Sequence, residues 1–170
     1  MSVEEELQEH AGEARDPFDK RVAGTMAIMA AGLAIVSVTG HLATTEEIVM
    51  QARASDQWAY YQAKSIRRYE SEIARDMLTS QPSKVAEYEK NAARYNKEGE
   101  EIQKEAQALE DESHSKGREA VRLELSEVFF EVAIVLASLA ILTKLKPVWW
   151  ISIVTGLGGI AVAVTAMLMK

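Results

Sequence analysis

The sequence of 170 residues contains no cysteine. It therefore has no disulfide framework, no thiolate metal site and no cysteine nucleophile. It also lacks an excess of positive charge, because 26 Asp and Glu stand against 19 Lys and Arg, for a formal net charge of −7. This balance argues against a nucleic-acid partner, since phosphate backbones are bound mainly through Lys and Arg.

Motifs of catalysis and metal binding are also missing from the sequence. His10 and His114 stand alone in polar segments, and the sequence has no HExxH motif, no Glu-x-x-His pair and no carboxylate dyad of catalytic spacing. The glycine-rich run at 156–159 lies inside an apolar stretch and has no Lys-Ser or Lys-Thr after it, so it is not a nucleotide-binding loop. The sequence predicts a protein that is not an enzyme and holds no cofactor or metal.

What the sequence does contain is long apolar runs, at residues 22–43, 128–143 and 148–169. A membrane-spanning helix needs about 20 apolar residues, so the first and third are long enough. The second spans if it begins near residue 124. The acidic segment 1–21 lacks the basic region that opens a signal peptide, so we interpret the first run as a retained anchor.

These runs predict an all-α integral membrane protein with spanning helices at 22–43, 124–143 and 148–170, the last two joined by a loop at 144–147. Asp16 is expected to cap the first helix, with Pro17 in its first turn. Trp149 and Trp150 are expected at the membrane interface.

Residues 44–123 are expected to form a long extramembrane hairpin of two antiparallel helices in a coiled coil, because apolar and small residues recur at spacings of three and four. The row in the first arm is Ile48, Ala52, Ser55, Ala59, Gln62, Ile66, Tyr69 and Ile73, and the row in the second is Val85, Tyr88, Ala92, Tyr95, Gly99, Ile102, Ala106 and Leu109. The turn is expected near 79–83, with Ser83 capping the second arm.

Two local features allow the long helices to break. Thr44 and Glu47 have the spacing of a capping box after Gly40, which slightly favours a break at 40–44. The second arm can break at 113–117, where its apolar residues stop, or can instead run on into the second membrane helix.

The stretches RDPFDKRVA, GHLATTEE and ASDQWAYYQAKSIRRYESEIARD resemble a bacterial membrane protein family catalogued only as a domain of unknown function (family 4337 of that series). The similarity covers most of the chain from Arg15 onward. It implies a bacterial membrane protein and brings no activity with it.

Basic residues predict how the chain crosses the membrane. Lys20, Arg21, Lys144 and Lys146 directly flank the spanning helices on one face. The positive-inside rule then puts the N-terminus in the cytoplasm and the hairpin outside, in a bacterial inner membrane.

Ionisable side chains near the outer edge form the first candidate site. His41 lies about two residues inside the end of the first spanning run, and Glu131 about three residues inside the second, with Glu127 one turn further out. One interpretation is a protonatable pair, or a ring of carboxylates lining an ion path in an oligomer. The other is that these groups are shallow enough to reach water or headgroups.

Small residues form candidate packing faces on two spanning helices, at Ala27, Ala30, Ala34, Ser37, Ser152, Thr155, Gly156, Gly159 and Ala163. Small residues let helices approach closely, either within one chain or between subunits. A candidate partner face in the hairpin contains Trp58, Tyr61 and Tyr69, for which ordinary helix packing is the alternative.

The sequence thus predicts an oligomeric membrane scaffold or accessory subunit, with a small channel or transporter that uses Glu131, Glu127 and His41 as the alternative. Its expected partners are membrane lipid, further copies of the chain, and another membrane or periplasmic protein.

Overall fold

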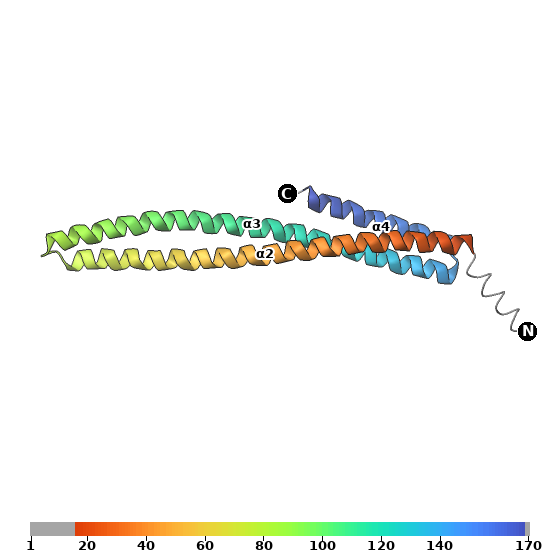
Figure 1. Ribbon diagram of the computed structural model, residues 1–170, viewed down its shortest axis with the longest axis horizontal. Helices are drawn as coiled ribbons and strands as arrows, with labels where there is room; N and C mark the ends of the chain where they lie inside the picture. Colours follow the sequence, from red (N-terminus) through yellow and green to blue (C-terminus); the bar gives the residue numbers. More distant parts are fainter. Residues whose placement is uncertain (1–15, 169–170) are drawn as a thin grey trace, which may run out of the picture. The chain divides into compact units, whose positions relative to one another are not determined.

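The computed structural model describes residues 16–168, which form three α-helices and, within that range, no β-strand (Figure 1). The helices are α2 (Pro17–Met77), α3 (Pro82–Thr143) and α4 (Lys146–Met167). The all-α prediction is confirmed. Most of the predicted acidic segment 1–21 lies outside the described residues.

Local rules account for where α2 and α3 start, because each helix begins at a proline. Asp16 Oδ1 accepts a hydrogen bond of 2.9 Å from the backbone N–H of Phe18, and Pro17 begins α2, as predicted. The prediction that Ser83 caps α3 is wrong, because Pro82 already begins that helix. The carbonyl oxygen of Gln81 instead accepts hydrogen bonds from the N–H groups of Lys84 and Val85.

The predicted helix break at 40–44 is wrong, because α2 is continuous there. A glycine inside a helix costs about 1 kcal/mol relative to alanine. Gly40 is buried, and a Cβ at this position would lie 3.4 Å from Cβ of Leu123 in α3, an ordinary van der Waals distance. At Gly40, α2 is thus packed on α3.

The alternative break at 113–117 is also absent, because α3 runs through it. Ser113 is buried and its hydroxyl donates to the carbonyl oxygen of Glu47, at 3.2 Å. The Lys116 ammonium lies 2.7 Å from a carboxylate oxygen of Glu46. Contacts to α2 thus replace the apolar residues that this stretch lacks.

The chain divides into two compact units. The hairpin unit comprises residues 44–117, and the apolar unit comprises, among the described residues, 16–43 together with 118–168. Residues 118–123, which the sequence assigns to the hairpin, therefore group with the apolar helices.

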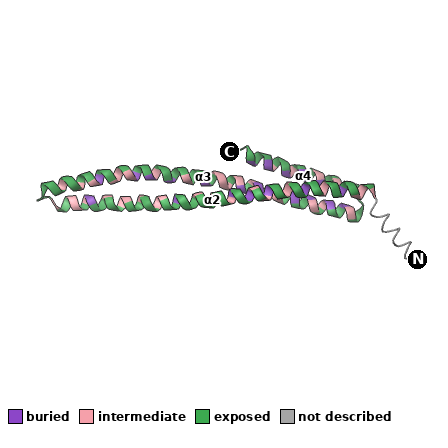
Figure 2. Ribbon diagram, in the orientation of Figure 1, coloured by how far each residue is buried: buried purple, intermediate pink, exposed green. Residues whose placement is uncertain are grey.

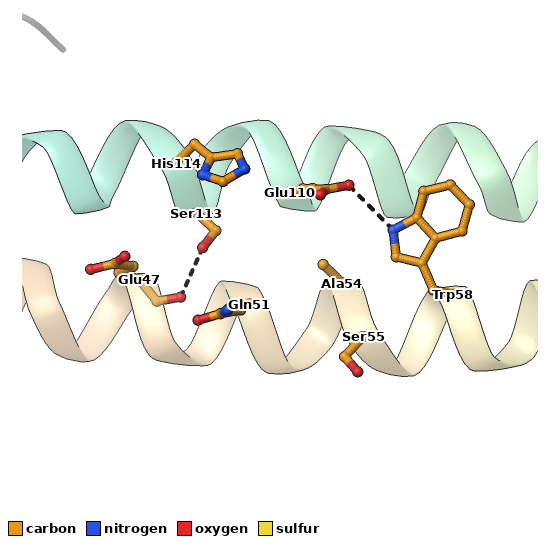
Figure 3. Close-up of a pocket in the computed structure, with 8 residues that line it drawn as sticks. All are labelled: Glu47, Gln51, Ala54, Ser55, Trp58, Glu110, Ser113 and His114. Carbon is orange, nitrogen blue, oxygen red and sulfur yellow. Dashed lines mark hydrogen bonds between the residues drawn. The ribbon is translucent and has the colours of Figure 1, made fainter.

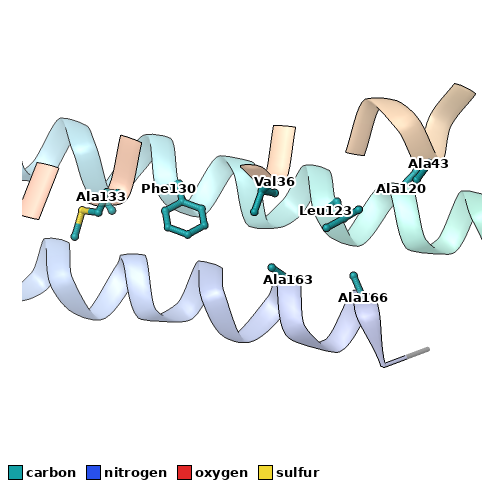
Figure 4. Packing of buried hydrophobic residues seen from close by; sticks show 9 residues of the cluster. Val36, Ala43, Ala120, Leu123, Phe130, Ala133, Ala163 and Ala166 are labelled. Atoms are coloured by element: carbon teal, nitrogen blue, oxygen red, sulfur yellow. The ribbon is translucent and has the colours of Figure 1, made fainter. Parts of the chain in front are cut away.

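Small side chains dominate the core of the apolar unit (Figure 4). Its buried cluster contains Met29, Val36, Ala43, Ala120, Leu123, Phe130, Ala133, Ala163 and Ala166. The buried hydroxyl of Ser126 in α3 donates to the carbonyl oxygen of Gly159 in α4, at 2.8 Å. Each of the three helices contains a segment long and apolar enough to cross a membrane.

In the hairpin unit α2 and α3 run antiparallel and are joined by polar contacts. The Lys64 ammonium lies 2.6 Å from Glu98, and Arg68 Nη1 donates to Asn96 Oδ1 at 2.7 Å. Of the two predicted rows, the one on α3 does face α2, and its members are buried or half-buried.

The predicted row on α2 faces the other way. All eight of its members, from Ile48 to Ile73, are exposed (Figure 2). Ser55, for example, points away from α3, whereas Ala54 points toward it (Figure 3). The prediction failed because it assumed that the most apolar row of α2 faces α3. The opposite row faces α3 instead, and its Lys64 and Arg68 find polar partners there. We call the eight exposed residues the outer row of α2.

Candidate functional site

Within residues 16–168 the structure contains no group of three His, Cys, Asp or Glu side chains arranged to hold a metal ion. A cleft of about 290 Å³ in the hairpin unit is lined by Glu47, Trp58, Glu110 and His114, among others (Figure 3). The Trp58 indole N–H donates to a Glu110 carboxylate oxygen across it, at 3.3 Å. The residues lining the cleft include no nucleophile held by a base.

The register of α2 against α3 decides where the predicted ionisable residues lie. A Cβ on Gly32 would lie 2.9 Å from Cε1 of Phe130, and Gly40 lies against Leu123. Gly32 and Gly40 are about 12 Å apart along α2, at 1.5 Å per residue. His41 follows Gly40 and lies just beyond the level of Leu123. Glu131 follows Phe130 and lies just beyond the level of Gly32, at the other end of this interval. The structure therefore does not bring His41 and Glu131 together.

The depth that the sequence analysis assigned to Glu131 is also corrected. Glu131 follows Phe130, which is level with Gly32, at the middle of the apolar run 22–43. Glu131 is exposed, whereas Glu127, one turn away, is half-buried. The sequence estimate counted depth from the end of the second apolar run, but Leu123 and Ala120 already pack in the core of the same unit.

The packing residues predicted in α4 lie inside the apolar unit. Ser152, Gly156, Gly159 and Ala163 are buried, and Thr155 is half-buried. A Cβ on Gly159 would lie 3.1 Å from Cβ of Phe129, so this glycine sets the approach of α4 to α3. In the part of the chain described, this face packs within one chain.

The packing residues predicted in the first spanning helix are arranged differently. Ala27, Ala30 and Ala34 are exposed, and Ser37 is half-buried. The buried residues of the same segment lie on another face, at Val22, Met29 and Val36. The small-residue face of α2 is thus available to a partner.

The three aromatic residues of the predicted partner face do not share one face. Trp58 and Tyr61 are half-buried and pack together edge to face, with ring centroids 5.7 Å apart. The Tyr61 ring lies 3.7 Å from the position a Cβ would take on Gly99 of α3. Tyr69 is exposed in the outer row, with the Arg68 guanidinium 4.5 Å from its ring centroid. Only Tyr69 remains available for a partner.

Ion pairs perturb several side chains of the hairpin unit. The hydrogen bond from Lys64 holds the pKa of Glu98 below its ordinary value, and the same bond raises the pKa of Lys64. Hydrogen bonds from Arg67 and then Arg94 lower the pKa of Tyr95. The contacts of Lys64 with Glu98 and of Arg67 with Tyr95 join the two arms, whereas Arg94 lies on the same arm as Tyr95.

The structure also brings together a cluster that the sequence analysis used only to orient the chain. At one end of the apolar unit, the Lys144 ammonium lies 2.5 Å from Asp19 and 3.7 Å from Asp16. Arg21, Lys144, Lys146 and Trp149 line one cavity there. The grouping of the basic residues at helix ends was visible in the sequence, but the cavity was not.

The family model described as a domain of unknown function (DUF4337) matches residues 18–169. The chain belongs to this family. The resemblance seen in the sequence is thus confirmed. No curated protein and no solved structure matches the chain. Membership of DUF4337 supplies no activity.

Proposed function

We propose that the protein is a bacterial inner-membrane protein with three spanning helices and a projecting coiled-coil hairpin. It acts as an oligomeric scaffold or accessory subunit rather than as an enzyme. The apolar segments of α2, α3 and α4 support the membrane insertion, because each is long and apolar enough to cross a bilayer. Many large apolar side chains on these segments are exposed in the single chain, including Ile28, Ile35, Val135 and Val154.

The observation that carries the oligomeric scaffold is the outer row of α2. Ile48, Ile66, Tyr69 and Ile73 are each more than half exposed, at 59, 57, 54 and 59%. The face of α2 turned toward α3 is instead rich in polar side chains. Large apolar side chains exposed on the outer face, with small and polar residues between Ile48 and Ile66 and a polar face turned inward, are typical of a helix that meets a further partner.

The spacing of the outer row fits a second copy of the same helix. Ile48, Ser55, Gln62 and Tyr69 recur every seven residues, which is the repeat of helices in a left-handed coiled coil. In the sequence the same spacing includes Ala27 and Ala34, whose small side chains suit close packing in a membrane. Copies in one membrane have the same orientation, so the α2 helices run parallel and each position meets itself.

Disulfide cross-linking tests this arrangement, because the natural chain has no cysteine. Ser55→Cys in isolated membranes should form a disulfide-linked dimer on mild oxidation. Ala108→Cys, on an exposed position of α3, is the matched control and should stay monomeric.

Two other outcomes have definite meanings. If Ser55→Cys cross-links to Ile66→Cys but not to itself, the α2 helices of two copies are antiparallel rather than parallel. Equal cross-linking of Ser55→Cys and Ala108→Cys, together with a monomeric mass in mild detergent, would refute the oligomeric scaffold.

The orientation proposed for the chain has the N-terminus in the cytoplasm and the hairpin outside. Basic residues at one end of the apolar unit support it, since Arg21, Lys144 and Lys146 line one cavity there. The hairpin surface that the other copies leave uncovered is then the proposed binding surface for another membrane or periplasmic protein.

A second candidate function, a small oligomeric channel, is favoured by Glu131. This side chain is exposed although it lies level with the middle of the run 22–43. A carboxylate at that depth is costly in lipid unless it faces a partner or water. The candidate rests on Glu131 and Glu127, because His41 lies at another level. Proton flux into liposomes that is lost in Glu131→Gln would support it, and no flux above empty liposomes would exclude it.

A further inference from the structure

Two neighbouring cavities at one end of the apolar unit have complementary chemistry. The first, of about 630 Å³, is lined by Arg21, Lys144, Lys146 and Trp149, among others. The second, of about 300 Å³, is an apolar groove between α2 and α4 with Phe130 of α3 in its wall. Its lining includes Thr25, Met29, Gly32, Ile153, Gly156 and Ile160.

A hydrogen bond joins the two cavities. The Trp149 indole N–H lines the first cavity and donates to the Thr25 hydroxyl oxygen, which lines the second, at 3.1 Å. The Thr25 hydroxyl donates in turn to the carbonyl oxygen of Val22, at 2.7 Å. Phe18 packs edge to face on the Trp149 ring, with centroids 5.8 Å apart. The indole is therefore held in place where the polar cavity meets the groove.

The lining of the first cavity has more basic than acidic side chains, because Arg21, Lys144 and Lys146 stand against the single carboxylate of Asp16. Lys144 is paired with Asp16 and with Asp19. Arg21 and Lys146 are exposed, and among the described residues neither forms an ion pair. Two guanidinium or ammonium groups beside an aromatic ring are suited to a phosphodiester at a membrane surface.

The groove has the length and depth of an acyl-chain site. It runs from Thr25 to Gly32 on α2 and from Ile153 to Ile160 on α4, which is about 10 Å along each helix. One leaflet contributes about half of the 30 Å hydrocarbon core, so the groove covers most of one leaflet. Its Thr25 end is the one joined to the basic cavity through Trp149, which is where a headgroup would lie.

From these observations we propose that this end of the apolar unit binds an anionic phospholipid. Arg21 and Lys146 hold its phosphodiester, Trp149 lies at the level of its glycerol backbone, and the groove between α2 and α4 takes one acyl chain. The proposal rests on the membrane insertion proposed above. It adds a defined lipid site on the face with the basic residues, and thus a way for membrane composition to affect the packing of α2 and α4.

The test is lipid binding to the full chain in mild detergent, counted by native mass spectrometry. Phosphatidylglycerol and phosphatidylcholine with identical acyl chains are the probes. The natural chain should retain phosphatidylglycerol in preference to phosphatidylcholine. In the double variant R21Q/K146Q this preference should fall by roughly thirtyfold, from the loss of two basic contacts.

Matched variants test whether the site itself, rather than the total charge of the chain, gives the preference for phosphatidylglycerol. R118Q/R122Q removes the same charge elsewhere in the apolar unit and should keep the preference. R21K/K146R keeps both charges and should also keep it. Inorganic phosphate should not displace the bound phosphatidylglycerol, because it cannot occupy the groove; displacement by phosphate alone would overturn the lipid site in favour of a phosphate site.

The proposal is overturned if R21Q/K146Q and R118Q/R122Q bind phosphatidylglycerol equally, or if phosphatidylcholine binds as well as phosphatidylglycerol to the natural chain. An alkaline wash of membranes distinguishes this failure from failure of the proposed function. Release of the chain by the wash would overturn membrane insertion and the lipid site together. Retention of the chain with equal lipid binding would overturn the lipid site alone.

Discussion

The ring of Phe130 lies directly against Gly32, so closely that a Cβ on this glycine would be 2.9 Å from Cε1 of the ring. Phe130 is buried and cannot easily move away. This contact fixes the register of α2 against α3 in the apolar unit. It also sets the level of Glu131, the next residue in α3.

Gly32→Ala should therefore lower the stability of the chain by about 1–3 kcal/mol, because the added methyl group overpacks the contact with Phe130. Gly24→Ala is the matched control in the same helix, since nothing lies within 4 Å of a Cβ there. It should be neutral or stabilising by about 0.5–1 kcal/mol. Thermal unfolding in mild detergent measures both. Equal effects of the two changes would show that Phe130 does not pack on Gly32.

Gly159→Leu should destabilise the chain by at least about 1–3 kcal/mol, because Cβ of Phe129 and the carbonyl oxygen of Ser126 already lie 3.1 and 3.3 Å from the position of a new Cβ. The oligomer mass in mild detergent should not change, because this face packs within one chain. Ile160→Leu, at an exposed neighbour, should leave both unchanged. A shift in oligomer mass without loss of thermal stability would show instead that Gly159 packs at a subunit interface.

His41→Gln and Glu131→Gln should have additive effects on stability, to within about 0.3–0.5 kcal/mol. The reason is their separation along the helices, which exceeds the range of a direct contact. A double-mutant cycle by thermal unfolding measures the coupling. The pair Lys64 and Glu98, in contact at 2.6 Å, provides a positive control in the hairpin unit. Clear coupling between His41 and Glu131 would mean that they meet, within a chain or between subunits.

Cysteines at Ser80 and Leu145 should react oppositely with a membrane-impermeant thiol reagent in whole cells. Ser80 lies in the turn between α2 and α3 and should be labelled, because the hairpin is proposed to lie outside. Leu145, beside the basic residues Lys144 and Lys146, should be protected until the cells are permeabilised. Both positions are exposed in the chain, so burial does not explain a difference. The reverse pattern would invert the proposed topology.

The ion pair between Lys64 and Glu98 should make the hairpin unit less stable in acid. The pKa of Glu98 is lowered in the folded chain from its ordinary value of 4.5, so the stabilisation is present above that pH and is lost as the pH falls through the lowered pKa. Glu98→Gln should therefore lower the melting temperature at neutral pH but not well below pH 4.5. Glu101→Gln, an exposed neighbour, is the control. If the melting temperature of Glu98→Gln stays below that of the natural chain in strong acid, the ion pair with Lys64 is not the cause of the difference.

Some elements could be predicted from local sequence because their causes are local. Asp16 and Pro17 begin α2 as predicted, since a cap needs only a side chain and the next two or three N–H groups. The row on α3 from Val85 to Leu109 faces its partner as predicted. Gly40 and Ser113 misled the prediction of helix breaks, because contacts with the other helix outweigh the weak local preference of each residue. Ser83 misled the prediction of where α3 starts, because Pro82 is itself suited to the first position of a helix.

Composition and spacing are enough to predict three helices rich enough in apolar residues to cross a membrane, a proline turn between two long arms, and membership of one family. These features need no knowledge of the partner surface. The face of α2 that meets α3, the different levels of Glu131 and His41, and the cavity that Arg21 and Lys146 share with Trp149 are visible only in the folded chain. Each depends on the register and rotation of one helix against another, and these are set by contacts such as that of Phe130 with Gly32, between residues far apart in the chain.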